Sequence, residues 1–154
     1  MKCSRHTLAN STLLVFLAGS TASFAQEQKI QCETLPTAVR TAFEKTYPKA
    51  MINGCATEVK EGKTVYEITS KEGQTDRDAL LYDDGTVIEV EETVALDSLP
   101  DPVQKALHIR YRRDEVTLAE KIMRDGAVLY EFHVNQKGKL DEVVFDPDGT
   151  EVKP

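Results

Sequence analysis

The sequence predicts a two-layer α+β fold in which two helices pack on one face of an antiparallel sheet. Three observations lead to this prediction. Apolar residues recur at helical spacing in two segments, each segment is followed by short alternating strands with glycine-containing turns, and the pattern occurs twice along the chain. The expected order of elements is therefore αββββ, repeated in tandem.

The first helix is expected at about residues 35–47, and the second lies 64 residues further on. The apolar stripes that predict them are Leu35, Val39, Ala42, Phe43 and Tyr47 in the first helix, and Leu99, Val103, Ala106, Leu107 and Tyr111 in the second. Thr34 and Ser98 stand where an N-cap is expected, just before Leu-Pro.

Four strands are expected after each helix. Their ranges are 50–60, 65–69, 78–82 and 86–90 in the first half, and 114–124, 128–134, 141–146 and 150–153 in the second. Glycine-containing turns separate them, because positive φ is favourable for glycine. A linker is expected near 91–98.

The two halves align without a gap at an offset of 64. This alignment has 11 identities over the 56 pairs from 35/99 to 90/154, against roughly three or four expected by chance for such a composition. The expected organisation is a segment over 26–33, a first repeat over 34–92 and a second repeat over 98–154. The alignment indicates a duplication.

Composition limits the classes of partner. The chain has 154 residues, with 19 Lys and Arg against 26 Asp and Glu, for a net charge of −7. Binding to nucleic acid or to an anionic membrane surface requires clustered basic side chains, so this balance argues against both. At this length, one domain or two small halves that share a core are expected.

Residues 1–25 have the anatomy of a secretory signal peptide: Lys2 and Arg5, then a short apolar run, then small residues ending at Ala25. The run is too short for a spanning helix. We therefore expect cleavage after Ala25, a periplasmic or secreted product, and no transmembrane segment after cleavage. Cys32 and Cys55 would then be the two cysteines of the exported chain, and one disulfide between them is predicted. Unpaired thiols or an intermolecular link remain alternatives.

The layout resembles the PepSY-like family of small exported bacterial proteins. The resemblance rests on the Leu-Pro-x-x-Val helix starts, the Tyr47-Pro48 helix end, the Gly-x-x-x-Tyr-Glu hairpins at 62–67 and 126–131, and the Asp-Gly turns. It implies a tandem fold similar to that of the β-lactamase inhibitory protein, with one curved antiparallel sheet. It also implies a binding or inhibitory module, and it brings no catalytic residues.

The sequence contains no recognisable catalytic constellation, so an enzyme is not expected. The pair Glu131 and His133 is interpreted mainly as a structural contact, and no metal site is predicted. The acidic turns contain weak candidate ligands for calcium, namely Asp83, Asp84, Asp146 and Asp148. Turn chemistry alone explains these aspartates, and no other cofactor is expected.

The remaining candidate is the sheet face that the helices leave uncovered. Its expected members are Glu67, Thr69, Leu129, Glu131 and His133. Such an acidic face with a few apolar members suits a protein or basic peptide partner. A merely solvated face is the plain alternative. The expected function is an exported, non-catalytic protein-binding module that inhibits or modulates a periplasmic or secreted partner such as a peptidase. A calcium-responsive sensor or buffer is the second hypothesis.

Overall fold

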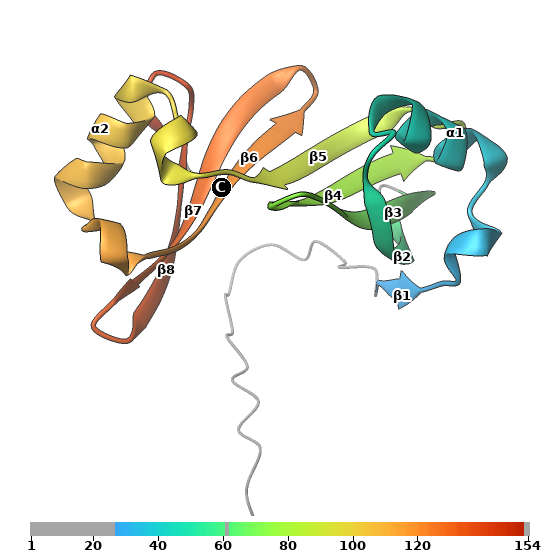
Figure 1. Ribbon diagram of the computed structural model, residues 1–154, viewed down its shortest axis with the longest axis horizontal. Coiled ribbons are helices and arrows are strands. Elements are labelled where there is room, and N and C mark those ends of the chain that lie inside the picture. Colours follow the sequence, from blue (N-terminus) through green and yellow to red (C-terminus); the bar gives the residue numbers. More distant parts are fainter. Residues whose placement is uncertain (1–26, 61, 153–154) are drawn as a thin grey trace, which may run out of the picture.

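The computed structural model describes residues 27–60 and 62–152 (Figure 1). The expected signal peptide and its cleavage after Ala25 lie outside the described residues. Within them, two helices and a nine-stranded antiparallel open sheet form an α+β structure. The predicted fold class is confirmed at this level.

The strands pair strictly in sequence order, each antiparallel to the next. They are β1 (Gln28–Lys29), β2 (Met51–Lys60), β3 (Lys63–Glu72), β4 (Thr75–Tyr82), β5 (Val87–Thr93), β6 (Val116–Arg124), β7 (Ala127–Gln136), β8 (Lys139–Phe145) and β9 (Glu151–Val152). Both edge strands have two residues, which leaves little unpaired backbone at the edges to recruit another strand.

The helices are α1 (Thr37–Thr46) and α2 (Asp101–Arg110). Short 3₁₀ helices lie at Cys32–Thr34, Leu96–Ser98 and Arg113–Glu115. The expectation that Thr34 and Ser98 cap the helices is wrong. Each helix begins after a proline, and the two hydroxyls donate hydrogen bonds to the carbonyls of Gln31 and Ala95 in the preceding 3₁₀ turns.

Two apolar clusters hold the helices against the sheet. Phe43 of α1 packs with Ile68 and Leu81, and Leu107 of α2 packs with Phe132 and Phe145. Side chains alternate across a strand, and the paired strands carry this alternation in register from β2 to β8. Both clusters therefore lie on the same face of the sheet.

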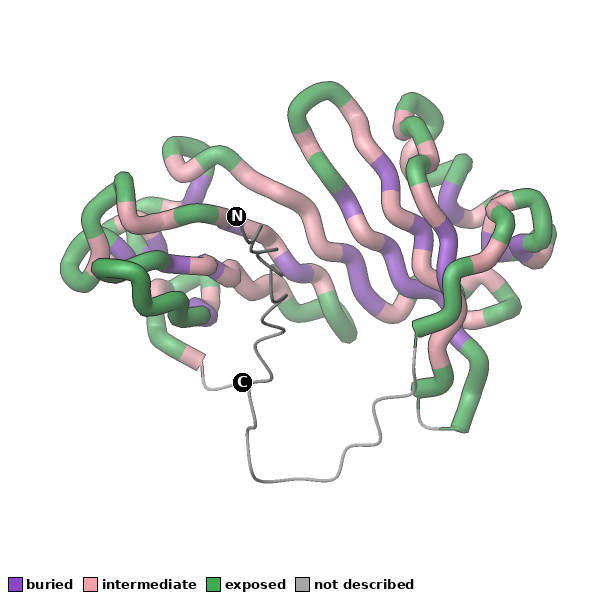
Figure 2. The backbone as a smooth tube through the Cα atoms, turned by 90° about the horizontal axis from the view of Figure 1, so that it is seen from below, coloured by how far each residue is buried: buried purple, intermediate pink, exposed green. Residues whose placement is uncertain are grey.

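The sheet curves so that the two helices lie on its outer side, one toward each end (Figure 1). Figure 2 looks toward the opposite, inner side, where buried strand residues run through the middle of the molecule. The inner face carries no helix.

Several strands extend further than the sequence predicted. β4 begins at Thr75 and β5 continues to Thr93, so part of the expected linker near 91–98 is strand. Residues 89–93 of β5 pair with residues 120–124 of β6, which makes one continuous sheet of the two halves. The fourth strand of the second half, β9, has only two residues.

Cys32 and Cys55 form a disulfide, with Cα atoms 5.3 Å apart. It joins the 3₁₀ turn before α1 to β2, and both residues belong to the first apolar cluster or pack against it. Next to it, the guanidinium of Arg40 donates a hydrogen bond to the Cys32 carbonyl. The disulfide therefore holds the segment that leads into α1 against the sheet.

Candidate functional site

Five consecutive strands each contribute a carboxylate to one row across the inner face. These five residues, here called the acidic row, are Glu67 (β3), Asp78 (β4), Glu91 (β5), Glu120 (β6) and Glu131 (β7). Asp78 is paired directly with Glu91, and Glu120 with Glu131. Neighbouring strands are spaced by about 4.8 Å, so the row extends about 19 Å across the sheet.

Apolar side chains form a floor beneath these carboxylates. Ala56, Leu80, Ile122 and Val144 are all buried although no helix covers them. They lie on the inner face because each is in register with an inner-face residue, as Leu80 is with Glu67 and Ile122 is with Glu91. Because these four side chains are themselves buried, a bound partner would contact mainly the carboxylates and the half-buried Leu129, which is paired with Ile122.

Burial, and after it the neighbouring carboxylates, shift the pKa values of three members of the acidic row. Partial burial raises the pKa of Glu67, Glu91 and Glu120, because it penalises the charged form. Neighbouring carboxylates raise these pKa values further. For Glu91 the contributing charges include Glu120 and Glu131, which lie across the junction between β5 and β6.

Few cations offset this charge on the inner face. Arg124 is paired with Glu89, and His133 with Glu131. By contrast, Arg77 lies on the outer side, where it is buried over the ring of Tyr47 and paired with Glu92 at 2.6 Å. One carboxylate oxygen of Asp78 is buried without a hydrogen-bond partner among the described residues.

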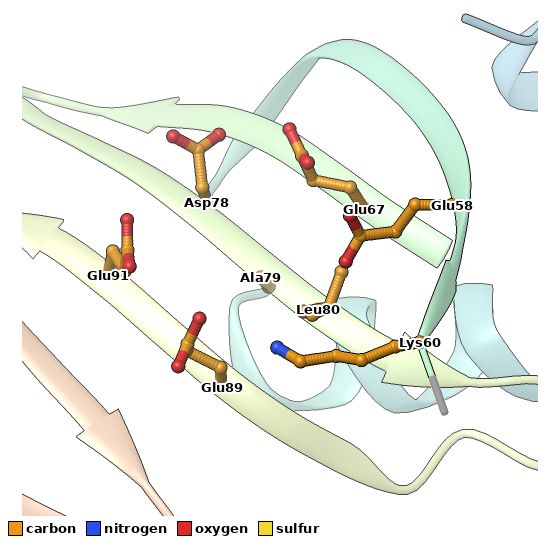
Figure 3. A pocket seen from close by; sticks show the side chains of 8 residues that line it. All are labelled: Glu58, Lys60, Glu67, Asp78, Ala79, Leu80, Glu89 and Glu91. Atoms are coloured by element: carbon orange, nitrogen blue, oxygen red, sulfur yellow. The ribbon is translucent and has the colours of Figure 1, made fainter. Parts of the chain in front are cut away.

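A pocket of about 220 Å³ opens at one end of the acidic row (Figure 3). Lys60 is the one basic side chain in its lining. The lining residues are Glu58, Lys60, Glu67, Asp78, Ala79, Leu80, Glu89 and Glu91. The pocket has the chemistry of a receptor for an ammonium or guanidinium group, because several carboxylates converge on one small space.

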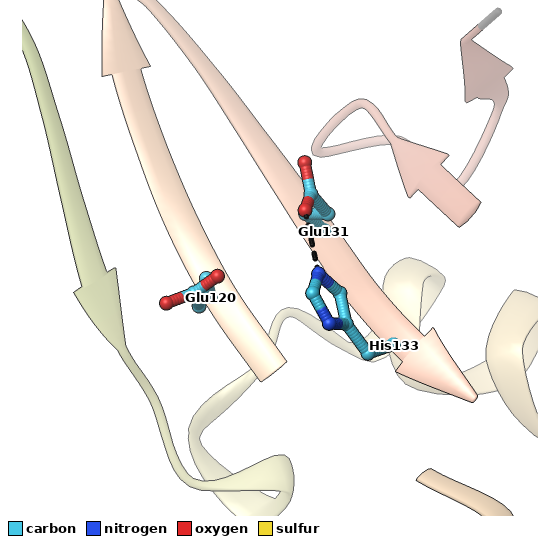
Figure 4. Close-up of side chains that lie close together, drawn as sticks. All are labelled: Glu120, Glu131 and His133. Carbon is cyan, nitrogen blue, oxygen red and sulfur yellow. Dashed lines mark hydrogen bonds and ion pairs between the residues drawn. The ribbon is translucent and has the colours of Figure 1, made fainter. Parts of the chain in front are cut away.

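At the other end, Glu120, Glu131 and His133 converge (Figure 4). The Nε2 atom of His133 lies 3.1 Å from Oε1 of Glu131. One possible ligand atom from each of the three residues lies within 4.8 Å of those of the others. Among the described residues, this is the one group with the spacing that a metal ion requires.

The acidic turns use their carboxylates locally. Asp84 accepts a hydrogen bond from the Thr86 amide, which lowers the pKa of that carboxyl. Asp146 accepts from the amides of Asp148 and Thr150 at 3.0 and 2.9 Å. In the part of the chain that the structure describes, neither Asp83 nor these aspartates belong to a group with metal-ligand spacing.

All five residues that the sequence singled out, Glu67, Thr69, Leu129, Glu131 and His133, lie on the inner face. The sequence missed Asp78, Glu91 and Glu120, which complete the acidic row. Strand alternation alone could have placed Glu91 and Glu120 beside one another only if the pairing of β5 with β6 had been predicted. The sequence predicted a strand that ended at residue 90, whereas β5 continues to Thr93 and its last residues pair with β6.

Solved structures provide the comparison with known proteins. A DUF2874 family protein from Bacteroides ovatus is 21% identical with a TM-score of 0.60, and covers 78% of this chain and 86% of its own. A protein of Bacteroides eggerthii described as periplasmic is 19% identical, with a TM-score of 0.64 and coverage of 77% and 86%. A BLIP-like protein from Bacteroides fragilis is 18% identical, with a TM-score of 0.58 and coverage of 75% and 82%.

At these identities the similarity shows the fold alone. No family model matches the chain, and no curated protein matches it. Among the residues that the structure describes, no helix has the length and apolar character that crossing a bilayer requires.

Proposed function

We propose that this protein is an exported, non-catalytic module that binds a basic segment of another protein on its inner face, in the periplasm or outside the cell. The observation that carries the proposal is the acidic row, five carboxylates on five adjacent strands with few cations beside them. An extended face of this kind costs folding energy, since like charges directly opposite one another destabilise a sheet. Binding a cationic partner would recover that energy.

The charge pattern supports a partner with lysine or arginine side chains. Complementary charge raises the rate of encounter and excludes partners of the wrong sign. The half-buried Leu129, on the same face as Glu131, supplies apolar area close to the carboxylates, as in the centres of protein interfaces. A segment with alternating basic and apolar side chains would match both features.

The tandem organisation is part of the proposal. Moved by 64 residues, seven of the eight residues in the first buried cluster coincide with members of the second. The Asp-Gly turns also correspond, because Gly85 lies against Ala38 and Ala42 of α1, and Gly149 against Pro102 and Ala106 of α2. These correspondences support a duplication and the resemblance to the PepSY-like family.

The BLIP-like neighbour supports a binding rather than a catalytic role. Inhibition of a secreted peptidase is the specific form of modulation that we propose. A calcium-responsive role draws no support from the turns, because the carboxylates of Asp84 and Asp146 are engaged by backbone amides. The export signal over 1–25 completes the proposed route to the envelope.

A labelled ten-residue peptide of alternating lysine and leucine tests the proposal. Its affinity is measured by fluorescence anisotropy for the wild type and for the triple variant Glu67→Gln/Glu91→Gln/Glu120→Gln. The control is Glu33→Gln/Glu44→Gln/Asp125→Asn, which removes the same charge from exposed positions away from the inner face. We expect at least a tenfold loss of affinity in the first triple variant and less than a twofold loss in the control. Equal losses in both would contradict the proposed face.

A further inference from the structure

We propose that Glu120, Glu131 and His133 bind a divalent transition-metal ion such as Zn²⁺. The three residues come from two neighbouring strands and project from the same face. Glu120 is the direct cross-strand partner of Glu131, and His133 follows two residues along β7, on the same side of the sheet. Their convergence is therefore fixed by strand pairing rather than by a loop.

The distances suit coordination. Nitrogen and oxygen ligands bind Zn²⁺ at about 2.0–2.2 Å, so two neighbouring ligands in tetrahedral or octahedral geometry lie about 3.0–3.5 Å apart. The Nε2 atom of His133 and Oε1 of Glu131 are 3.1 Å apart. All three ligand atoms lie within 4.8 Å of one another, so the Glu120 carboxylate would have to move only a short way toward a bound ion.

The charge around the three residues favours a cation. Glu120 makes no hydrogen bond or ion pair with its side chain among residues 27–60 and 62–152, and it is half-buried. Asp78, Glu131 and Glu142 add negative potential at its carboxylate. A divalent ion would neutralise two of these charges at once.

The donor set selects the class of metal. An imidazole nitrogen with two carboxylates suits zinc, copper, nickel or iron, whereas calcium takes oxygen ligands. Three protein ligands leave at least one coordination position open, since Zn²⁺ takes four. The imidazole is 45% exposed, so water or a partner's side chain can occupy that position. The site is thus distinct from the calcium candidates in the turns.

The test is a titration of the purified protein, without a polyhistidine tag, with ZnCl₂ by calorimetry and with CoCl₂ by visible absorption. The variants are His133→Ala, His133→Gln and Glu120→Gln. His108→Ala removes an exposed imidazole on α2 and serves as the matched control. Thermal unfolding followed by circular dichroism shows whether each variant folds.

We expect one Zn²⁺ per chain, a metal-dependent rise in melting temperature, and cobalt absorption bands that zinc abolishes. All three variants at the proposed site should weaken binding at least tenfold while still folding, and the control variant His108→Ala should bind within twofold of the wild type. Binding by folded His133→Ala within twofold of the wild type would overturn the proposal. So would the absence of zinc binding at 1 mM.

Discussion

Glu120 of β6 and Glu131 of β7 face one another directly across the strand pair, and neither carboxylate is paired with a lysine or arginine among the described residues. Such a pair does not stabilise the apo protein. Removing one charge by Glu120→Gln should therefore raise the free energy of unfolding by about 0.2–1 kcal/mol. Urea unfolding at pH 7 measures the change.

Glu44→Gln provides the contrast on the outer side. Glu44 pairs with Arg40 one helical turn away, at 3.7 Å. Its loss should lower the free energy of unfolding by a few tenths of a kcal/mol, about 0.3–0.5 at most. If Glu120→Gln and Glu44→Gln both stabilised the protein, the cause would be the lower net charge and not the position of Glu120 on the inner face.

Stability should increase as the pH falls from 7 toward 5. The folded-state pKa values of Glu67, Glu91 and Glu120 are raised above their usual 4.5, so the folded chain holds more protons than the unfolded chain in this range. Their contribution is fully present below about pH 4.5 and is lost as the pH rises through the folded-state values. Melting temperatures in matched buffers measure the slope.

Two further features make the pH profile diagnostic. Asp84 and Asp97 have lowered pKa values, so stability should fall again as the pH drops below their usual 3.8. The triple variant Glu67→Gln/Glu91→Gln/Glu120→Gln should lose most of the rise between pH 7 and 5 but keep the fall at lower pH. If stability still rose by the same amount between pH 7 and 5 in that variant, groups other than these three glutamates would cause the rise.

Loss of the disulfide should destabilise the fold. Cys32 and Cys55 are separated by 23 positions, and closing a loop of that size contributes about 3–3.5 kcal/mol in the chain-entropy model. Urea unfolding with and without dithiothreitol measures the difference. The Cys32→Ser/Cys55→Ser variant should match the reduced wild type and show no response to dithiothreitol, whereas a continued response would show that the effect does not come from this disulfide.

Gly149 and Gly126 separate backbone conformation from packing. Both have a φ of +78°, but a Cβ at Gly149 would lie 2.5 Å from the Pro102 carbonyl oxygen, whereas one at Gly126 would meet nothing within 4 Å. Gly126→Ala should cost about 1–2 kcal/mol for the left-handed backbone. Gly149→Ala should cost about 1–3 kcal/mol more, because α2 must shift. Equal costs by urea unfolding would show that the turn does not support the helix.

The sequence was informative wherever local periodicity determined the structure. Val39 and Phe43 predicted the buried side of α1, and the alternation around Phe132 predicted the two faces of β7. The N-caps failed because Thr34 and Ser98 satisfy the backbone of the preceding 3₁₀ turns instead. A threonine or serine hydroxyl can cap a helix that follows it or hydrogen-bond within a turn that precedes it. Here each helix begins after the proline, two residues beyond the hydroxyl, so the hydroxyl bonds within the turn.

The candidate site was only half predictable, because its completeness depends on strand register. Glu67 and Glu131 were found since they occupy equivalent places in two clear hairpins. Glu91 and Glu120 meet through the pairing of β5 with β6, which joins the two halves and has no counterpart within either one. The proximity of residues that meet only at this junction cannot be predicted from the hydrophobic periodicity of either half.

The most direct test of the central claim places a photo-crosslinking residue, p-benzoylphenylalanine, on each side of the sheet in cells that naturally produce the protein. Thr69 lies on the inner face and lines a pocket there, and Thr41 is exposed on α1. We expect a discrete crosslinked protein from Thr69, absent from Thr41 and lost when Glu67→Gln, Glu91→Gln and Glu120→Gln are added. The same adduct from Thr41, or from neither position, would contradict an inner binding face.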